Sequence, residues 1–185
     1  LKGSMDLAAC SLCDPLRLAE LDIEHLAGNP VTALDPASHR LQLADGQWLD
    51  YARLLIATGG RARLLPNVPS RLANVLYLRT HDEAIALRSA LKPGTRLVVI
   101  GGGFIGLEVA ATARALNCQV TLLEAGPRLA GRVLPERLSA ALLELHVRNG
   151  VDVRLNVSIE ALQGESRVEA VQLVSGEQLA CDLLV

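Results

Sequence analysis

A run of glycines between two apolar segments constrains the fold of this chain more than any other feature of its sequence. The segment Leu97–Ile100 is continuously apolar, as expected of a strand buried on both faces of a parallel sheet. Residues 101–106 then read Gly-Gly-Gly-Phe-Ile-Gly, and a helical pattern with small alanines follows. A second apolar segment, Val120–Leu123, ends at an acid, Glu124. We therefore predict a strand, a glycine turn, a helix and a parallel strand over residues 95–124.

The glycine run fits the pattern Gly-x-Gly-x-x-Gly, in which each glycine has a physical task. Gly101 permits the tight turn, Gly103 lets the backbone approach a pyrophosphate, and Gly106 lets the helix pack closely on the strand. The free amides and the positive dipole end of the helix N-terminus attract phosphate groups. Glu124 lies 23 positions after Gly101 (124 − 101 = 23), where a carboxylate accepts hydrogen bonds from an adenosine ribose. The pattern predicts a dinucleotide site; the alternative is a glycine turn that binds nothing.

The charge at the end of the second strand favours NAD(H) over NADP(H). Glu124 would repel a 2′-phosphate, and the next two residues, Ala125 and Gly126, offer no adjacent cation. Arg128 and Arg132 lie slightly further on and either could fold back toward a phosphate; each is equally well read as an ordinary solvated arginine.

The composition excludes several classes of protein. The chain has 185 residues, 50% of them hydrophobic, enough to bury a core of one domain or of one domain and part of another. The net charge of −2 comes without a basic cluster, which argues against a nucleic-acid partner. No window approaches the roughly 20 uninterrupted apolar residues that span a bilayer, so no membrane association is expected. The 4 cysteines do not make a disulfide scaffold and the histidines lack metal spacing, so we expect a cytoplasmic setting and no metal site.

Before the glycine unit, the pattern is that of a small antiparallel meander. Strands are expected at Val31–Asp35, His39–Leu43 and Trp48–Tyr51, where apolar and polar residues alternate and an Asp-Gly turn precedes the last strand. The run Leu54–Ala57 is continuously apolar and ends in Thr-Gly-Gly, as expected of a strand buried on both faces.

After Pro66 and Pro69, which mark a crossing between domains, helices and strands alternate. A helix is expected after Thr80 and another at about Glu136–Val147. Short strands are expected near Val151–Leu155, Val168–Val174 and Gln178–Val185. The fold class is therefore α/β: a Rossmann-like domain with a parallel sheet, together with the small antiparallel β-meander.

Four stretches, in this order, carry a resemblance to a known family: Leu54–Gly59, Asn74–Thr80, the glycine turn through Glu108 to Glu124, and Gly126–Leu129 with Arg132. The chain resembles the pyridine nucleotide-disulfide oxidoreductase superfamily. Within it, the chain resembles in particular the ferredoxin reductase components of bacterial aromatic-ring dioxygenases and their rubredoxin and putidaredoxin reductase relatives. The resemblance covers nearly the whole chain. It implies a flavoprotein that passes hydride from NADH to FAD and electrons on to a ferredoxin-type iron–sulfur protein.

The resemblance also divides the chain and gives roles to single residues. Residues 1–65 would be part of an FAD-binding domain, and residues 66–185 the NAD(H)-binding domain. Glu108 would lie near the nicotinamide and pair with a lysine beside the flavin, which Lys2 would supply. The turn Ala57-Thr58-Gly59 and Arg63 would lie near FAD. The residues expected near NAD(H) are Gly101, Gly102, Gly103, Phe104, Ile105, Gly106, Glu108, Glu124 and Arg132.

The chain also departs from the family pattern. The family's motif that binds the FAD pyrophosphate would precede residue 1, and the family's later FAD segment and interface domain would follow Val185. The resemblance therefore implies a fragment that binds NADH but neither retains FAD nor turns over. Two alternative functions remain: that of a related NADH-dependent disulfide, nitrite or oxygen reductase, and that of a non-catalytic NAD-binding module that senses redox state. Cys10 and Cys13 have the spacing of a redox pair, but they precede the glycine motif, whereas in thioredoxin-reductase-like enzymes the pair follows it.

Overall fold

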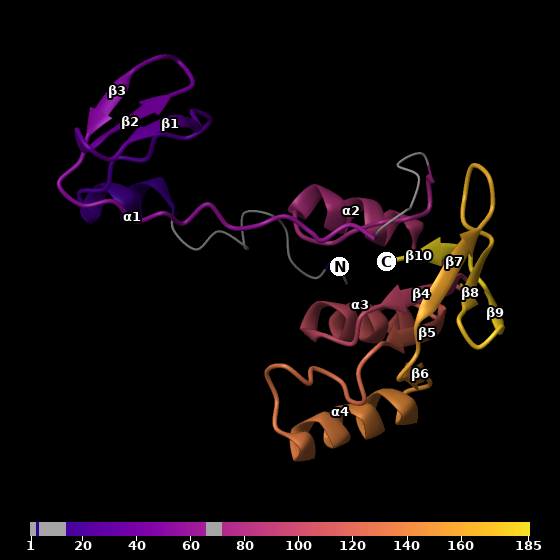
Figure 1. The fold of residues 1–185 in the computed structure, drawn as a ribbon. Helices are drawn as coiled ribbons and strands as arrows, with labels where there is room; N and C mark the ends of the chain where they lie inside the picture. The colour runs from indigo at the N-terminus through magenta and orange to yellow at the C-terminus, as the bar shows by residue number, and fades with distance from the viewer. Residues whose placement is uncertain (1–2, 4–13, 66–71) are drawn as a thin grey trace. The chain divides into compact units, whose positions relative to one another are not determined.

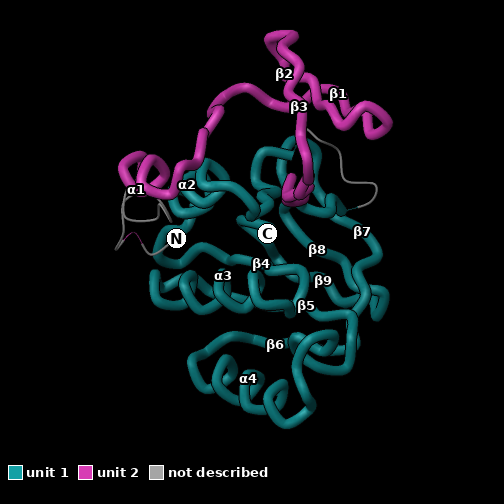
Figure 2. The backbone as a smooth tube through the Cα atoms, turned by 90° about the vertical axis from the view of Figure 1, so that its left-hand side faces the viewer, with its two compact units in different colours: residues 1–2, 61–185 teal, residues 3–60 magenta. Residues whose placement is uncertain are grey.

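The computed structural model describes Gly3, residues 14–65 and residues 72–185. The chain divides into two compact units, one of which ends at Gly60 and the other of which begins at Arg61 (Figure 2). Lys2, Cys10, Cys13 and the two prolines at 66 and 69 lie outside the described residues.

The smaller unit contains a short helix and the expected meander (Figure 1). Helix α1 (Pro15–Glu20) is capped by Asp14, whose side chain accepts a hydrogen bond of 2.8 Å from the backbone N–H of Arg17. Strands β1 (Val31–Asp35), β2 (Arg40–Leu43) and β3 (Trp48–Asp50) pair antiparallel in that order. The antiparallel meander predicted from the alternating pattern is confirmed.

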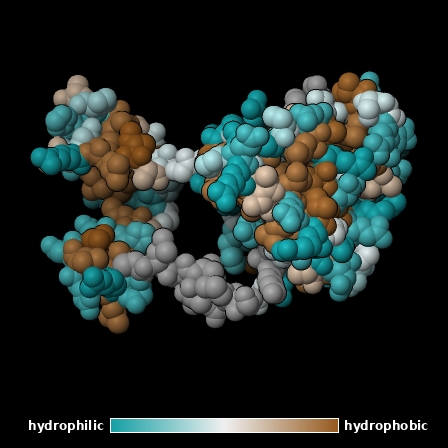
Figure 3. Space-filling view, turned by 90° about the horizontal axis from the view of Figure 1, so that it is seen from below, coloured by the Kyte–Doolittle hydropathy of each residue, from teal (hydrophilic) through white to brown (hydrophobic). Residues whose placement is uncertain are grey.

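The strand predicted over Leu54–Ala57 does not form. The backbone of this segment takes up no regular structure, and the side chains of Leu55 and Ile56 are 87% and 67% exposed. A strand buried on both faces needs neighbouring strands and a layer over each face, and the described residues of this unit provide neither. Figure 3 accordingly shows hydrophobic side chains uncovered on the surface of the smaller unit.

The larger unit is built on a four-stranded parallel sheet with the order β10-β4-β5-β6. Its strands are β4 (Arg96–Ile100), β5 (Gln119–Glu124), β6 (Asp152–Leu155) and β10 (Leu183–Leu184). Helix α3 (Phe104–Ala115) connects β4 to β5, and α4 (Glu136–Arg148) connects β5 to β6. A further helix, α2 (His81–Ala90), begins with a capping box between Thr80 and Glu83. The predicted strand, glycine turn, helix and strand are confirmed, and with them the α/β fold class.

A second, antiparallel sheet follows the parallel one along the chain. It consists of β7 (Ile159–Gln163), β8 (Ala170–Leu173) and β9 (Gln178–Ala180). The single strand expected over 178–185 is divided, because Cys181 and Asp182 carry the chain from β9 into β10 of the parallel sheet. Strand β7 is not among the predicted strands.

The core lies on both faces of the parallel sheet. Side chains alternate along β4: Leu97 and Val99 pack with the helices, whereas Val98 packs with Val168 and Val171 of the antiparallel layer. Figure 1 shows the helices on one side of β4 and β5 and the β7–β9 sheet on the other. Because both faces are covered, the carboxyl ends of β4 and β5 are the part of this sheet that is free to bind a ligand.

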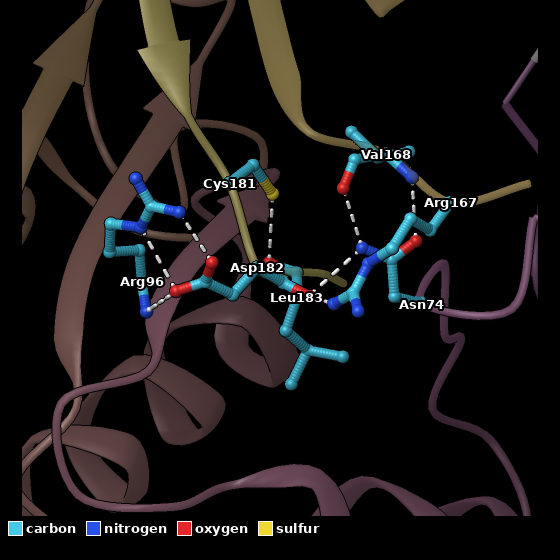
Figure 4. A network of polar contacts seen from close by, with 7 residues as sticks. All are labelled: Asn74, Arg96, Arg167, Val168, Cys181, Asp182 and Leu183. Atoms are coloured by element: carbon cyan, nitrogen blue, oxygen red, sulfur yellow. Dashed lines mark hydrogen bonds and ion pairs between the residues drawn. The ribbon is translucent and has the colours of Figure 1, made fainter. Parts of the chain in front are cut away.

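A polar network lies at the amino ends of β4 and β10 (Figure 4). The carboxylate of Asp182 accepts hydrogen bonds of 2.9 Å from the backbone N–H and from Nε of Arg96, and these bonds lower the pKa of Asp182 to about 2. The side-chain amide of Asn74 donates to the carbonyls of Val168 and Asp182 at 2.7 and 2.9 Å. Burial raises the pKa of the neighbouring Cys181 thiol to about 11. The network therefore joins the segment before α2 to both sheets, away from the glycine turn.

Candidate functional site

The glycine turn has the geometry that each glycine requires. Gly101 adopts a φ of +107°, and its N–H donates to the carbonyl of Leu123 at 2.8 Å. A Cβ on Gly106 would overlap the carbonyl oxygen of Gly101, so α3 packs on the turn at a distance that only glycine allows. Around Gly103, in contrast, no atom lies within 4 Å of where a Cβ would stand. Space is therefore open at the one glycine assigned to the pyrophosphate.

The N-terminus of α3 faces this open space without a cap of its own. Gly103 is the N-cap residue, no side chain accepts a hydrogen bond from the first turn, and the first turn carries no acid. The first amides of a helix have no partner within the helix, and the dipole adds positive charge there. These are the features of a helix N-terminus that binds an anion.

Glu124 is fixed beside the turn by two backbone amides. At the end of β5, half-buried, its carboxylate accepts 2.7 Å hydrogen bonds from the N–H of Gly102 and the N–H of Gly126. Each carboxylate oxygen has two lone pairs, so both oxygens can still accept from ribose hydroxyls. The two bonds fix the orientation of the carboxylate.

A cavity of about 720 Å³ opens in front of this carboxylate. Pockets for small molecules and cofactors lie in the range of about 300–1,000 Å³. The walls come from the glycine turn, the end of β5 and the loop that follows it: Gly103, Phe104, Glu124, Gly126, Pro127, Arg128, Ala130, Gly131, Arg132 and Val133. The predicted residues Gly103, Phe104, Glu124 and Arg132 are thus brought together.

The two arginines of the loop differ in their surroundings. Arg132 is exposed at the cavity, and no hydrogen bond or ion pair joins it to another described residue. Arg128 is half-buried, and its guanidinium donates to the carbonyl of Leu134 and, at 3.3 Å, to Oγ of Ser139. Of the two, only Arg132 has a side chain free of such bonds.

A second, smaller hollow of about 280 Å³ adjoins the first turn of α3. Leu78, Arg79 and Thr80 line it together with three predicted residues, Phe104, Ile105 and Glu108. Phe104 and Ile105 are 55% and 53% exposed, and Glu108 is exposed as well. Phe104 lines both spaces and so connects the two parts of the site.

The residues assigned to FAD are exposed in the structure. Ala57, Thr58 and Gly59 belong to the smaller unit, where Gly59 has a φ of +69°. Arg63 belongs to the larger unit. Their roles stay predictions, as do that of Lys2 and the pairing of Glu108 with it.

The structure adds contacts that the sequence did not predict. The N–H of Ala130 donates to the carbonyl of Gly102 at 2.8 Å, and Ala130 itself has a φ of +48°. Left-handed backbone is uncommon for alanine, so nothing in the sequence pointed to this contact. Within the described ranges, no group of acids, histidines or cysteines could hold a metal, and no helix is long and apolar enough to span a bilayer.

Comparisons with known proteins agree on one group. The family model described as pyridine nucleotide-disulphide oxidoreductase matches residues 7–185. The ferredoxin–NAD(+) reductase subunit of the benzene 1,2-dioxygenase system of Pseudomonas putida is 42% identical over 91% of this chain and 42% of its own length. Putidaredoxin reductase of the same organism is 40% identical over 100% of this chain and 45% of its own length.

The solved structures that match this chain are also reductases. The crystal structure of the covalent putidaredoxin reductase–putidaredoxin complex matches with a TM-score of 0.88 and 39% identity, covering 99% of this chain and 45% of that one. A NAD-dependent persulfide reductase from A. fulgidus matches with a TM-score of 0.79 and 25% identity, over 93% of this chain and 33% of that one. The chain spans less than half the length of each of these relatives.

Proposed function

Because the chain belongs to the pyridine nucleotide-disulphide oxidoreductase family, we propose that it is the NADH-binding part, with a segment of the FAD domain, of a ferredoxin reductase. The whole protein would pass hydride from NADH to FAD and single electrons to a ferredoxin-type iron–sulfur protein. One observation carries the proposal: Glu124, oriented by two backbone amides, faces a cavity that ends at the open N-terminus of α3. The names of the relatives, a ferredoxin–NAD(+) reductase subunit and a putidaredoxin reductase, support the choice of electron acceptor.

The described residues fit a dinucleotide along this cavity. The open backbone at Gly103 and the uncapped amides of α3 would hold the pyrophosphate. Glu124 would accept hydrogen bonds from the ribose, and the loop after β5 would lie against the adenosine half. The nicotinamide half would then extend toward the smaller hollow beside Phe104, Ile105 and Glu108.

The surroundings of Glu124 support a preference for NADH. A 2′-phosphate at the ribose would meet this carboxylate, and the guanidinium of Arg128, the nearer arginine in the sequence, already donates hydrogen bonds to Leu134 and Ser139. The exposed Arg132 is then the cation that remains to compensate the charge. We expect the repulsion of a 2′-phosphate by Glu124 to exceed its attraction by Arg132. Glu124 is held beside the ribose position by two hydrogen bonds, whereas no described residue holds the side chain of Arg132.

In the complete protein the flavin would supply the hydride acceptor, and this chain would orient the donor. Ala57-Thr58-Gly59 and Arg63 would contribute to the FAD site, and Glu108 would pair with Lys2 near the nicotinamide. These roles follow from the family resemblance. A reductase of a related acceptor is the second candidate, which the persulfide reductase match supports.

The deciding experiment is the visible absorption spectrum of the full-length gene product, recorded before and after anaerobic addition of NADH, with NADPH in parallel. We expect a flavin band that NADH bleaches faster than NADPH. Subsequent addition of an oxidised ferredoxin or of a persulfide distinguishes the two candidate acceptors. A colourless protein that still binds NADH would refute the flavoenzyme proposal and favour a non-catalytic NAD-binding module.

A further inference from the structure

The loop from Gly126 to Leu134 forms one wall of the large cavity. Its midpoint is attached to the glycine turn, since the N–H of Ala130 donates to the carbonyl of Gly102 at 2.8 Å. The N–H of Leu134 in turn donates to the carbonyl of Ala130 at 3.0 Å. The loop therefore contains a turn of its own, and Ala130 attaches it to the glycine turn.

Arg128 provides the second point of attachment, from inside the loop. Its guanidinium donates to the carbonyl of Leu134, at the far end of the loop, and to Oγ of Ser139. Ser139 lies near the start of α4 and is only 2% exposed. A Cβ on Gly131 would stand 3.1 Å from Cγ of Arg128, so the loop folds closely over the stem of this side chain. Arg128 therefore connects both ends of the loop to the core helix α4.

We propose that Arg128 is a positioning residue for the dinucleotide: its guanidinium holds the 126–134 loop in the shape against which the adenosine half binds. A planar guanidinium can satisfy two acceptors in different directions at once, whereas an ammonium is a compact point charge. The loop also carries Arg132, so the same hydrogen bonds hold the backbone from which that exposed side chain extends. The inference rests on the proposed binding of NADH.

A role through charge alone is the competing explanation. Within the part of the chain that the structure describes, no carboxylate lies within ion-pair distance of Arg128, so no ion pair neutralises its charge, although neutral acceptors engage the guanidinium. Such a charge would attract an anionic ligand through space. The two explanations differ for a lysine at this position, which keeps the charge, and for loss of Ser139, which removes an acceptor and leaves the charge in place.

The test compares Arg128→Met, Arg128→Lys and Ser139→Ala with a matched control, Arg137→Met, on the exposed side of α4. The dissociation constant for NADH is measured from the nicotinamide fluorescence on this chain, with the urea midpoint recorded for each variant. KM and kcat for NADH are measured in the full-length protein. Removing hydrogen bonds to a charged group predicts roughly tenfold weaker NADH binding for Arg128→Met and roughly threefold for Ser139→Ala. We expect kcat at saturating NADH to be unchanged, and Arg128→Lys to resemble Arg128→Met.

Wild-type affinity in both Arg128→Met and Ser139→Ala would overturn the proposal. Wild-type affinity in Arg128→Lys alone would also overturn it, because charge would then suffice. If Arg128→Met does not fold, Ser139→Ala and the lysine variant decide. Failure of the unaltered chain to bind NADH is a separate result, which would refute the proposed function itself.

Discussion

Replacing Gly106 by alanine tests the packing of the glycine turn most directly. The new Cβ would overlap the carbonyl oxygen of Gly101 and would lie 3.2 Å from its carbonyl carbon and 3.3 Å from Cγ1 of Val99. The first two are backbone atoms, which cannot rotate away as a side chain can, so α3 must shift from β4. The buried face of α3, including the fully buried Val109 and Ala113, would shift with it. Overpacking of a close-packed site costs about 1–3 kcal/mol, and we expect the upper end of this range.

Gly103→Ala is the matched control for this change. Its Cβ would meet nothing within 4 Å, and Gly103 has an extended backbone with a φ of −80°, which alanine adopts without strain. We expect its free energy of unfolding to stay within about 0.5 kcal/mol of the unaltered chain. NADH binding should nevertheless be lost, because the methyl group stands where the pyrophosphate approaches the backbone.

Urea denaturation followed by circular dichroism measures the first effect, and nicotinamide fluorescence the second. The reasoning is refuted if Gly106→Ala unfolds at the same urea concentration as the unaltered chain, or if Gly103→Ala retains full affinity for NADH.

Three further predictions concern single side chains. Glu124→Gln removes the charge that opposes a 2′-phosphate, so the ratio of NADH to NADPH affinity should fall roughly tenfold; an unchanged ratio in fluorescence titrations would count against the assigned role. Asp182 has a pKa lowered to about 2 in the folded state by Arg96, so its stabilising effect is complete above the unfolded pKa near 3.8 and is lost as the pH falls toward 2. Because this pair is partly exposed, the difference in unfolding free energy between the unaltered chain and Asp182→Asn should be about 1 kcal/mol or less at pH 7. It should be mostly lost by pH 2 and should vanish only below that pH, as urea titrations would test. Cys181 and Cys118 are buried, and burial raises both thiol pKa values, that of Cys181 to about 11. Iodoacetamide at pH 8 should label these two only in urea, and peptide mass spectrometry showing their modification in the native chain would contradict the described burial.

The sequence predicts the central unit well because its signals are local. An apolar run followed by glycines and then by helical periodicity fixes the order of elements, and the distance from Gly101 to Glu124 is set by the helix between them. The structure accordingly places helix α3 at Phe104–Ala115 and ends β5 at Glu124.

What the sequence could not predict depends on contacts between distant residues. The attachment of Ala130 to Gly102 needs a left-handed alanine, which no composition rule indicates. The engagement of Arg128 by Ser139 depends on the position of α4 relative to the loop. The run Leu54–Ala57 reads as a buried strand because its side chains are apolar, yet burial requires a surrounding sheet that these described residues do not supply.

The orientation of Glu124 by two amides has a consequence for the kinetics of the cofactor. Because hydrogen bonds within the chain hold both carboxylate oxygens and the neighbouring loop, these groups have little conformational freedom to lose when a nucleotide binds. Association then needs no slow rearrangement of the adenosine side, and its rate is set by encounter with the cavity. If the proposed binding of NADH holds, discrimination between nucleotides is accordingly expressed in how quickly each one leaves, and NADPH dissociates from this unit sooner than NADH.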